Sequence, residues 1–168
     1  MKTLYLLRHA KSSWDDPDLD DADRPLGPRG REAAGRIAVH IRERGIAPQL
    51  VTCSPALRAR QTLEGLGDAI GAARVEIDRA IYDAHESDLL EILRRIEPGI
   101  ESTMMIGHNP SIERLALLLA AESALLDELR RKFPTAALAT LAFEVADWDE
   151  LRAGSGELAE FVKPRELG

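Results

Sequence analysis

Short apolar runs alternate with longer amphipathic segments along most of the chain. Runs typical of β-strands cover residues 3–7, 50–53, 75–81, 103–106, 139–145 and 158–162. Segments with helical spacing lie between them: one begins after Pro28 and Gly30 and ends at Gly45, and the others cover residues 56–70, 88–96 and 111–121. This alternation predicts an α/β fold in which helices cover both faces of a mostly parallel central sheet.

The end of the chain departs from this alternation. Little room for a long helix remains between residues 139–145 and 158–162, so we expect an antiparallel pair of strands at one edge of the sheet. No repeat, low-complexity tract or linker rich in Gly or Pro divides the sequence. We therefore expect residues 1–168 to form a single three-layer α/β/α domain.

Composition narrows the classes of partner and compartment. With 168 residues, 45% of them hydrophobic, the chain is long enough to bury a core. Its formal net charge of -7 argues against a general nucleic-acid or membrane-surface partner, although a local basic pocket remains allowed. One cysteine, Cys53, and the lack of an apolar run long enough for a signal peptide or a membrane span favour a soluble cytoplasmic protein.

The acidic segment W-D-D-P-D-L-D-D-A-D-R-P interrupts the pattern early in the chain. The D-x-D-x-D spacing at residues 16–20 hints at a calcium loop, but Asp21 stands where the turn needs Gly and Gly27 where the closing Glu belongs. We interpret the segment as a solvated loop. For Arg24 within it we expect a salt bridge to acidic neighbours, and contact with an anionic substrate is the alternative.

Three predicted strands end beside histidine or arginine. These polar residues are Arg8 and His9 after residues 3–7, Arg58 shortly after residues 50–53, and His108 after residues 103–106. Ligands of an open parallel sheet bind outside the carboxyl ends of its strands. We therefore expect Arg8, His9, Arg58 and His108 to surround one site.

Such a cluster suits phosphoryl transfer. The guanidinium groups of Arg8 and Arg58 offer planar forks of donors to phosphoryl oxygens, and His108 would help hold the charge that builds there. A neutral imidazole at His9 can attack phosphorus and form a covalent phosphohistidine, provided that its other ring nitrogen donates to an acceptor such as a backbone carbonyl. The four histidines include no closely spaced pair and no Gly-rich nucleotide loop is present, so we expect neither a metal nor a cofactor.

The same residues resemble a known family. L-L-R-H-A-K-S-S-W resembles the motif that opens the histidine phosphatase superfamily, and R-P-L-G-P-R-G-R-E-A-A, S-P-A-L-R-A-R-Q-T and I-G-H-N-P resemble its later blocks in the same order. The small size and the residues from Lys11 to Trp14 look most like SixA-type phosphohistidine phosphatases. The resemblance implies a phosphoglycerate mutase-like fold, without the large helical insertions that enclose sugar phosphates, and an open, shallow pocket. It also implies that His9 is phosphorylated and that Arg8, Arg58 and His108 bind phosphate.

Departures from the family pattern bear on the reaction. Ala10 replaces the usual Gly after the histidine, and Lys11 and Asp15 stand where mutases carry Glu and Asn, which weakens a mutase assignment. Larger relatives supply a general acid near the end of the third strand, where Asp83 and Glu86 are the carboxylate candidates and His85 is a further candidate. A leaving imidazole needs such an acid far less than a leaving alkoxide does.

The predicted function is therefore a metal-independent phosphatase that works through a covalent phosphohistidine. Its preferred substrate is phosphohistidine in a protein. A phosphatase of small phosphate esters or other phosphorylated metabolites is the alternative, and a phosphate-binding module without turnover is a third, less favoured hypothesis.

Three further residues are expected to stay outside the chemistry. Cys53 does not suit a cysteine phosphatase loop, because Ala59 occupies the position of the required arginine, and we interpret it as a buried thiol. Arg60 is expected at the surface. His40 lies inside a helical segment and is interpreted as a bystander.

Overall fold

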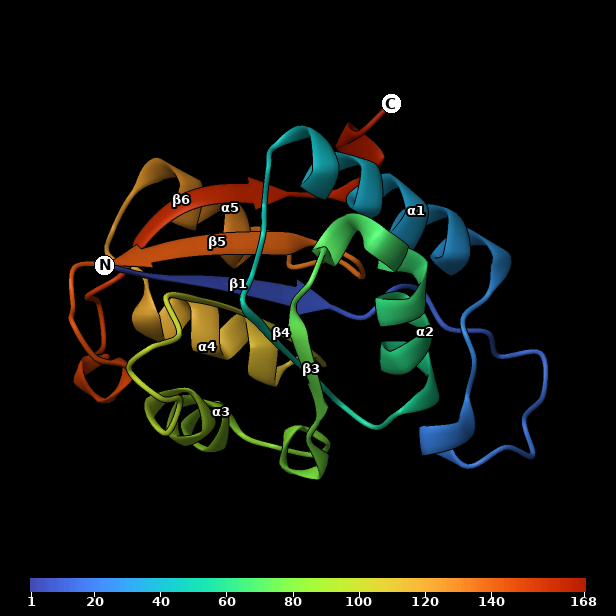
Figure 1. Ribbon diagram of the computed structural model, residues 1–168. Helices are drawn as coiled ribbons and strands as arrows, with labels where there is room; N and C mark the ends of the chain where they lie inside the picture. The colour runs from blue at the N-terminus through green and yellow to red at the C-terminus, as the bar shows by residue number, and fades with distance from the viewer.

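Six strands form one central sheet (Figure 1). The computed structural model describes residues 1–168. The strands are β1 (Lys2–Arg8), β2 (Leu50–Cys53), β3 (Arg74–Ile77), β4 (Ser102–Gly107), β5 (Leu138–Phe143) and β6 (Glu157–Val162). Their order across the sheet is β3-β2-β4-β1-β5-β6. Strands β3, β2, β4 and β1 are parallel to one another, β5 is antiparallel to β1, and β6 is antiparallel to β5.

Helices cover both faces of the sheet. They are α1 (Pro28–Glu43), α2 (Leu57–Leu66), α3 (Glu86–Arg94), α4 (Ser111–Leu119) and α5 (Ala124–Arg131). Short 3-10 helices are η1 (Asp21–Asp23), η2 (Gly67–Ile70), η3 (Arg79–Ile81), η4 (Trp148–Glu150) and η5 (Pro164–Glu166). One apolar cluster joins the sheet to α1 and α2, and a second joins its other face to α3, α4 and α5. Figure 1 shows α1 and α2 together on one side and α3 and α4 on the other.

Strand β1 lies in the middle of the sheet and contributes to both clusters. Leu4 and Leu6 pack toward α3, α4 and α5, whereas Leu7 packs toward α1 and α2, and all three are fully buried. A parallel strand that is buried on both faces reads as a continuous apolar run. The expectation of a mostly parallel α/β/α fold with an antiparallel edge is thus confirmed.

Two details of the predicted elements were wrong. The strand expected over residues 75–81 ends at Ile77, because the Asp78 side chain accepts a hydrogen bond from Ala80 N at 2.9 Å and begins η3. Helix α5 was not predicted. This helix covers eight residues and is capped by Ser123, whose hydroxyl accepts from Leu126 N at 3.1 Å.

The register of the central strands brings three strand ends to one edge of the sheet. Arg8 pairs with Gly107, and Cys53 pairs with Ile106. The hydrogen bonds continue one residue further: His9 N donates to Gly107 O at 3.0 Å and Ser54 N donates to Ile106 O at 3.0 Å. The side chains that follow β1, β2 and β4 are therefore held side by side by backbone hydrogen bonds.

The start of α1 packs directly on the loop that follows β1. A methyl group built on Gly30 would lie 2.1 Å from the carbonyl oxygen of Lys11. We expect Gly30→Ala to lower the free energy of unfolding by roughly 1–3 kcal/mol, because helix and loop must separate. Gly35 lies in the same helix with nothing within 4 Å of such a methyl group, so Gly35→Ala should raise that free energy by up to about 1 kcal/mol. Urea denaturation measures both values, and equal effects of the two substitutions would contradict the packing described here.

Candidate active site

The ring of His9 is held in one tautomer at the end of β1. Its Nδ1 lies 2.7 Å from the carbonyl oxygen of Ala10. A carbonyl can only accept, so Nδ1 carries the proton and donates it, and the lone pair of Nε2 is free. Burial lowers the pKa of His9 to about 3, and the nearby His108, Arg58 and Arg8 act in the same direction. The imidazole is therefore neutral at neutral pH.

His108 faces His9 across the site. The two ring centroids are 5.1 Å apart. Nδ1 of His108 lies 3.4 Å from Arg58 Nη2, and its Nε2 lies 2.7 Å from Ser54 Oγ. Because a guanidinium can only donate, Nδ1 accepts, and Nε2 donates to the Ser54 hydroxyl. Burial and then the charge of Arg58 lower the pKa of His108 to about 4, and an anion bound beside the ring would act in the opposite direction.

Two arginines direct buried donors into the same region. Arg58 of α2 donates from Nη1 to Asp21 O at 2.7 Å and from Nη2 to Asp21 Oδ2 at 2.9 Å. Arg8 donates from Nη1 to Phe133 O at 2.9 Å. The Nε atom of each arginine is buried and has no hydrogen-bond partner in the protein. An unpaired buried donor is costly, and an oxyanion is a ligand that accepts hydrogen bonds from such donors.

Asp21 is a central residue of this site that the sequence analysis placed only in a solvated loop. Its carboxylate accepts from the Tyr82 hydroxyl at 2.6 Å as well as from Arg58, and it forms an ion pair with Arg24 at 3.2 Å. The Tyr82 hydrogen bond, followed by those of Arg58, lowers the pKa of Asp21. Asp21 is therefore ionised at neutral pH and orients Arg58. No local pattern identifies it, because η1 reaches α2 only in the folded chain.

Arg24 is linked to the site through Asp21. The predicted salt bridge to an acidic neighbour is present, and the guanidinium also stacks on Trp14, 3.6 Å from the ring centroid. Its Nε and Nη1 atoms are buried without a hydrogen-bond partner. The alternative role, contact with an anion, therefore stays open for two of its donors.

A set of polar residues supports the histidine and arginine side chains. Thr62 Oγ1 accepts from Ala10 N at 2.9 Å and donates to Arg58 O at 2.7 Å, which ties the His9 loop to α2. Asn109 Nδ2 donates to Phe133 O at 3.0 Å, the same oxygen that receives Arg8. The signal for these residues was in the sequence, because both fall inside the family-like blocks that the sequence analysis quoted.

Of the two carboxylates predicted as general acid, only Asp83 lines a cavity beside His108. A cavity of about 370 Å³ beside His108 is lined in part by Asp21, Tyr82 and Asp83. Glu86 begins α3 and is not among the lining residues of this cavity. Asp83 is therefore the better placed of the two predicted carboxylates, because its exposed side chain lines the cavity beside His108.

The three residues expected outside the chemistry lie away from the histidine pair. Cys53 is fully buried, and burial raises the pKa of its thiol to about 12. Arg60 is exposed and donates from Nε to Pro55 O at 2.9 Å. His40 lies in the last turn of α1, and its Nε2 is 2.9 Å from Oε1 of Glu160 in β6.

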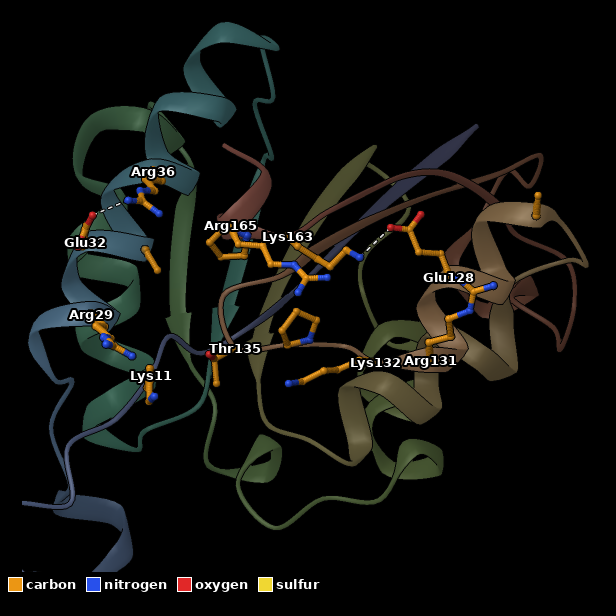
Figure 2. A pocket seen from close by; sticks show the side chains of 14 residues that line it. Lys11, Arg29, Glu32, Arg36, Glu128, Arg131, Lys132, Thr135, Lys163 and Arg165 are labelled. Carbon is orange, nitrogen blue, oxygen red and sulfur yellow. Dashed lines mark hydrogen bonds and ion pairs between the residues drawn. The ribbon is translucent and has the colours of Figure 1, made fainter. Parts of the chain in front are cut away.

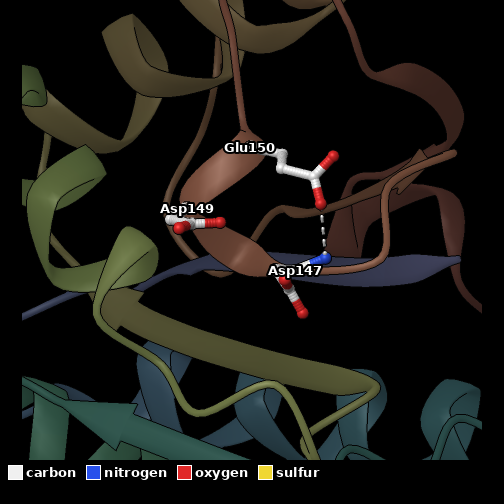
Figure 3. A group of neighbouring side chains, drawn as sticks. All are labelled: Asp147, Asp149 and Glu150. Carbon is white, nitrogen blue, oxygen red and sulfur yellow. Dashed lines mark hydrogen bonds between the residues drawn. The ribbon is translucent and has the colours of Figure 1, made fainter.

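One group of carboxylates could attract a cation. Asp147, Asp149 and Glu150 bring ligand oxygens within 4.8 Å of one another around η4 (Figure 3). Glu150 Oε1 accepts from Asp147 N at 3.1 Å, and the Asp147 side chain accepts from the backbone of the same short helix. These bonds form a capping box, which accounts for two of the three carboxylates without an ion.

Comparisons with known proteins identify similar sequences. The sequence profile of the histidine phosphatase superfamily (branch 1) matches residues 4–97. An uncharacterized protein of Mycobacterium tuberculosis is 34% identical over 163 residues, which are 95% of this chain and 100% of that protein. The phosphohistidine phosphatase SixA of Escherichia coli is 24% identical over 144 residues, covering 84% of this chain and 85% of SixA.

Solved structures match the whole fold. The SixA protein from Nakamurella multipartitia superposes with a TM-score of 0.86 at 29% identity, and the match covers 97% of this chain and 96% of that one. A tungstate complex of the protein histidine phosphatase SixA has a TM-score of 0.80 at 23% identity, with 98% of each chain covered, and supports the fold alone. No helix of the chain combines the length and the apolar character that crossing a membrane requires.

Arg58 offers a direct test of the site. We expect Arg58→Ala to weaken binding of orthophosphate or tungstate by roughly 1.5–3 kcal/mol, or about ten- to a hundredfold, because a charge-assisted contact is lost and the negative charge of Asp21 is no longer offset by Arg58. Arg60→Ala, two positions along the same helix but exposed, is the matched control and should bind with unchanged affinity. Isothermal titration calorimetry measures both. A similar loss in the two variants, or in neither, would show that Arg58 does not bind the anion.

Proposed function

This chain belongs to the histidine phosphatase superfamily (branch 1), and on that premise we propose that it is a phosphatase in which His9 becomes phosphorylated. The observation that carries the proposal is the hydrogen bond of 2.7 Å from His9 Nδ1 to Ala10 O. It leaves Nε2 unprotonated at the edge of the sheet where Arg8 and Arg58 hold unpaired donors. A neutral imidazole beside buried cationic donors is the arrangement that nucleophilic attack on a phosphoryl group requires.

The reaction proceeds in two displacements. The Nε2 lone pair of His9 attacks phosphorus, and the bond between phosphorus and the leaving group breaks, with its electron pair departing on that group. Arg8 and Arg58 bind the oxygens, and the phosphoryl charge raises the pKa of His108 so that Nδ1 can donate to one of them. Water then attacks the phosphohistidine, releases phosphate and regenerates the imidazole. The positive charge for these steps comes from the protein's own side chains, and we propose that no metal is needed.

Phosphohistidine in a protein is the substrate that this site suits best. Asp21, the carboxylate bonded to Arg58, is held ionised by Tyr82 and Arg58 and is a poor proton donor. An imidazole leaving group can be protonated before it departs and needs no strong acid from the enzyme. The E. coli relative that covers most of this chain is itself named a phosphohistidine phosphatase.

A phosphatase of small phosphate esters is the second candidate. Asp83 favours it, because this exposed carboxylate lines the cavity beside His108 and could protonate a leaving alkoxide. The two candidates are separated by offering the purified protein a phosphohistidine-bearing protein and a panel of sugar phosphates, without added metal. We expect faster turnover of the phosphohistidine protein. Faster turnover of an ester would overturn the preferred substrate class.

We expect His9→Ala to abolish turnover and the acid-labile phospho-enzyme, because the attacking nitrogen is removed. His40→Ala is the matched control, since His40 contacts Glu160 outside the site and its loss should leave activity unchanged. Rapid-quench labelling with a phosphorus-32 substrate measures the intermediate in both variants. A phospho-enzyme that persists in His9→Ala would refute the assignment of the nucleophile.

A further inference from the structure

A strongly basic groove lies next to the candidate active site and takes no part in the proposed chemistry. It encloses about 800 Å³ and is lined by 14 residues, seven of which are Lys or Arg and two of which are Glu (Figure 2). These side chains come from the loop after β1, from the start and middle of α1, from α5, from the segment before β5 and from the segment around η5. We call this surface the basic groove.

Most of the cations in the basic groove have no acidic partner. Both glutamates are already paired: Glu32 with Arg36 at 2.5 Å and Glu128 with Lys163 at 2.8 Å. The other five cations form no ion pair, and all are exposed; they are Lys11, Arg29, Arg131, Lys132 and Arg165. The chain as a whole carries a net charge of -7, so the basic groove is a positively charged region on a negatively charged protein. A concave surface of one sign attracts a ligand of the opposite sign.

The basic groove opens at the edge of the sheet that carries His9. Lys11 follows His9 by two residues, so the Cα atoms of the two residues are at most about 7 Å apart. On the other wall, Thr135 precedes Ala136, whose backbone N donates to Arg8 O at 3.0 Å and to His9 O at 3.1 Å. The end of the groove that Lys11 and Thr135 line is therefore near the segment that carries His9.

The lining of the basic groove indicates the chemistry of its occupant. No aromatic side chain lines it, and its hydrophobic lining residues are Ala33 and Ala124. Nucleobases bind by stacking on aromatic rings, and drug-sized ligands occupy mostly apolar pockets, so neither class suits this surface. In Figure 2 the cations stand on both sides of the groove, with Lys11 and Arg29 opposite Lys132. Charges distributed in this way match several carboxylates along an extended peptide better than one compact anion.

We propose that the basic groove docks an acidic segment of the phosphoprotein substrate and so guides its phosphohistidine to His9. This inference rests on the proposed function. It assigns specificity to two surfaces, since the small site recognises the phosphoryl group and the groove recognises the protein that carries it. Such electrostatic docking raises the association rate and weakens with salt.

The test compares two synthetic phosphohistidine peptides of equal length, one flanked by glutamates and one flanked by alanines. We expect the wild-type protein to hydrolyse the glutamate-flanked peptide with about tenfold or greater kcat/KM, mainly through a lower KM, and to lose this preference at high salt. The double variant R29E/R165E should hydrolyse both peptides with the kcat/KM of the alanine-flanked one. Both arginines are exposed and unpaired, and a glutamate in the first turn of α1 is compatible with the helix.

R95E/R152E is the matched control, because it makes the same change in net charge at two exposed arginines outside the groove. It should keep the preference for the glutamate-flanked peptide. Equal kcat/KM for the two peptides with the wild-type protein, or loss of the preference in the control variant, would overturn the proposal. Loss of turnover of the alanine-flanked peptide in R29E/R165E would also overturn it, because the groove would then act on the catalytic site.

A binding measurement separates this inference from the proposed function. Fluorescence anisotropy of labelled decaglutamate should show binding to the wild-type protein and to R95E/R152E but at least about tenfold weaker binding to R29E/R165E, whether or not any phosphohistidine is hydrolysed. Equal binding by the wild-type protein and R29E/R165E would overturn the groove assignment alone. A salt-sensitive dimer that is lost in R29E/R165E would also overturn it, because a second copy of this chain would then be the occupant.

Discussion

The hydrogen bond between His9 Nδ1 and the Ala10 carbonyl decides what the site can do, because it determines which ring nitrogen is free. That carbonyl is itself held in place: Ala10 N donates to Thr62 Oγ1, and the same hydroxyl donates to the carbonyl of Arg58. One short chain of hydrogen bonds therefore connects the loop that holds His9 to α2, the helix that carries Arg58. The proposed nucleophile and the donors that would stabilise the transferred group are positioned together.

Charge is distributed unevenly in this acidic protein. Around His9 and His108, burial and nearby guanidinium groups keep both imidazoles neutral, and the same guanidinium groups attract an oxyanion. Asp21 offsets part of this positive charge and orients Arg58. Beside the site, the basic groove repeats the positive sign over a larger area with exposed side chains. The small inner site suits a phosphoryl group, and the wider outer surface suits a protein.

The parts of the fold that follow from local pattern were predictable. The apolar runs ending at Arg8 and before His108 are central parallel strands, and parallel register brings their ends together, so the histidines and arginines were found as a group. Residues whose role depends on distant segments were not. Asp21 reaches Arg58 only because η1 packs on α2 in the folded chain. The basic groove escaped notice because its cations come from four separated segments of a chain with a negative average.

The nitrogen-15 chemical shifts of the His9 ring in phosphate-free protein test the central claim most directly. With the pKa of His9 lowered to about 3, the ring should remain neutral from neutral pH down to about pH 5, where a histidine with an ordinary pKa would be mostly protonated. The account predicts a protonated Nδ1 and an unprotonated Nε2 throughout this range. A proton on Nε2, or a doubly protonated ring at neutral pH, would contradict it.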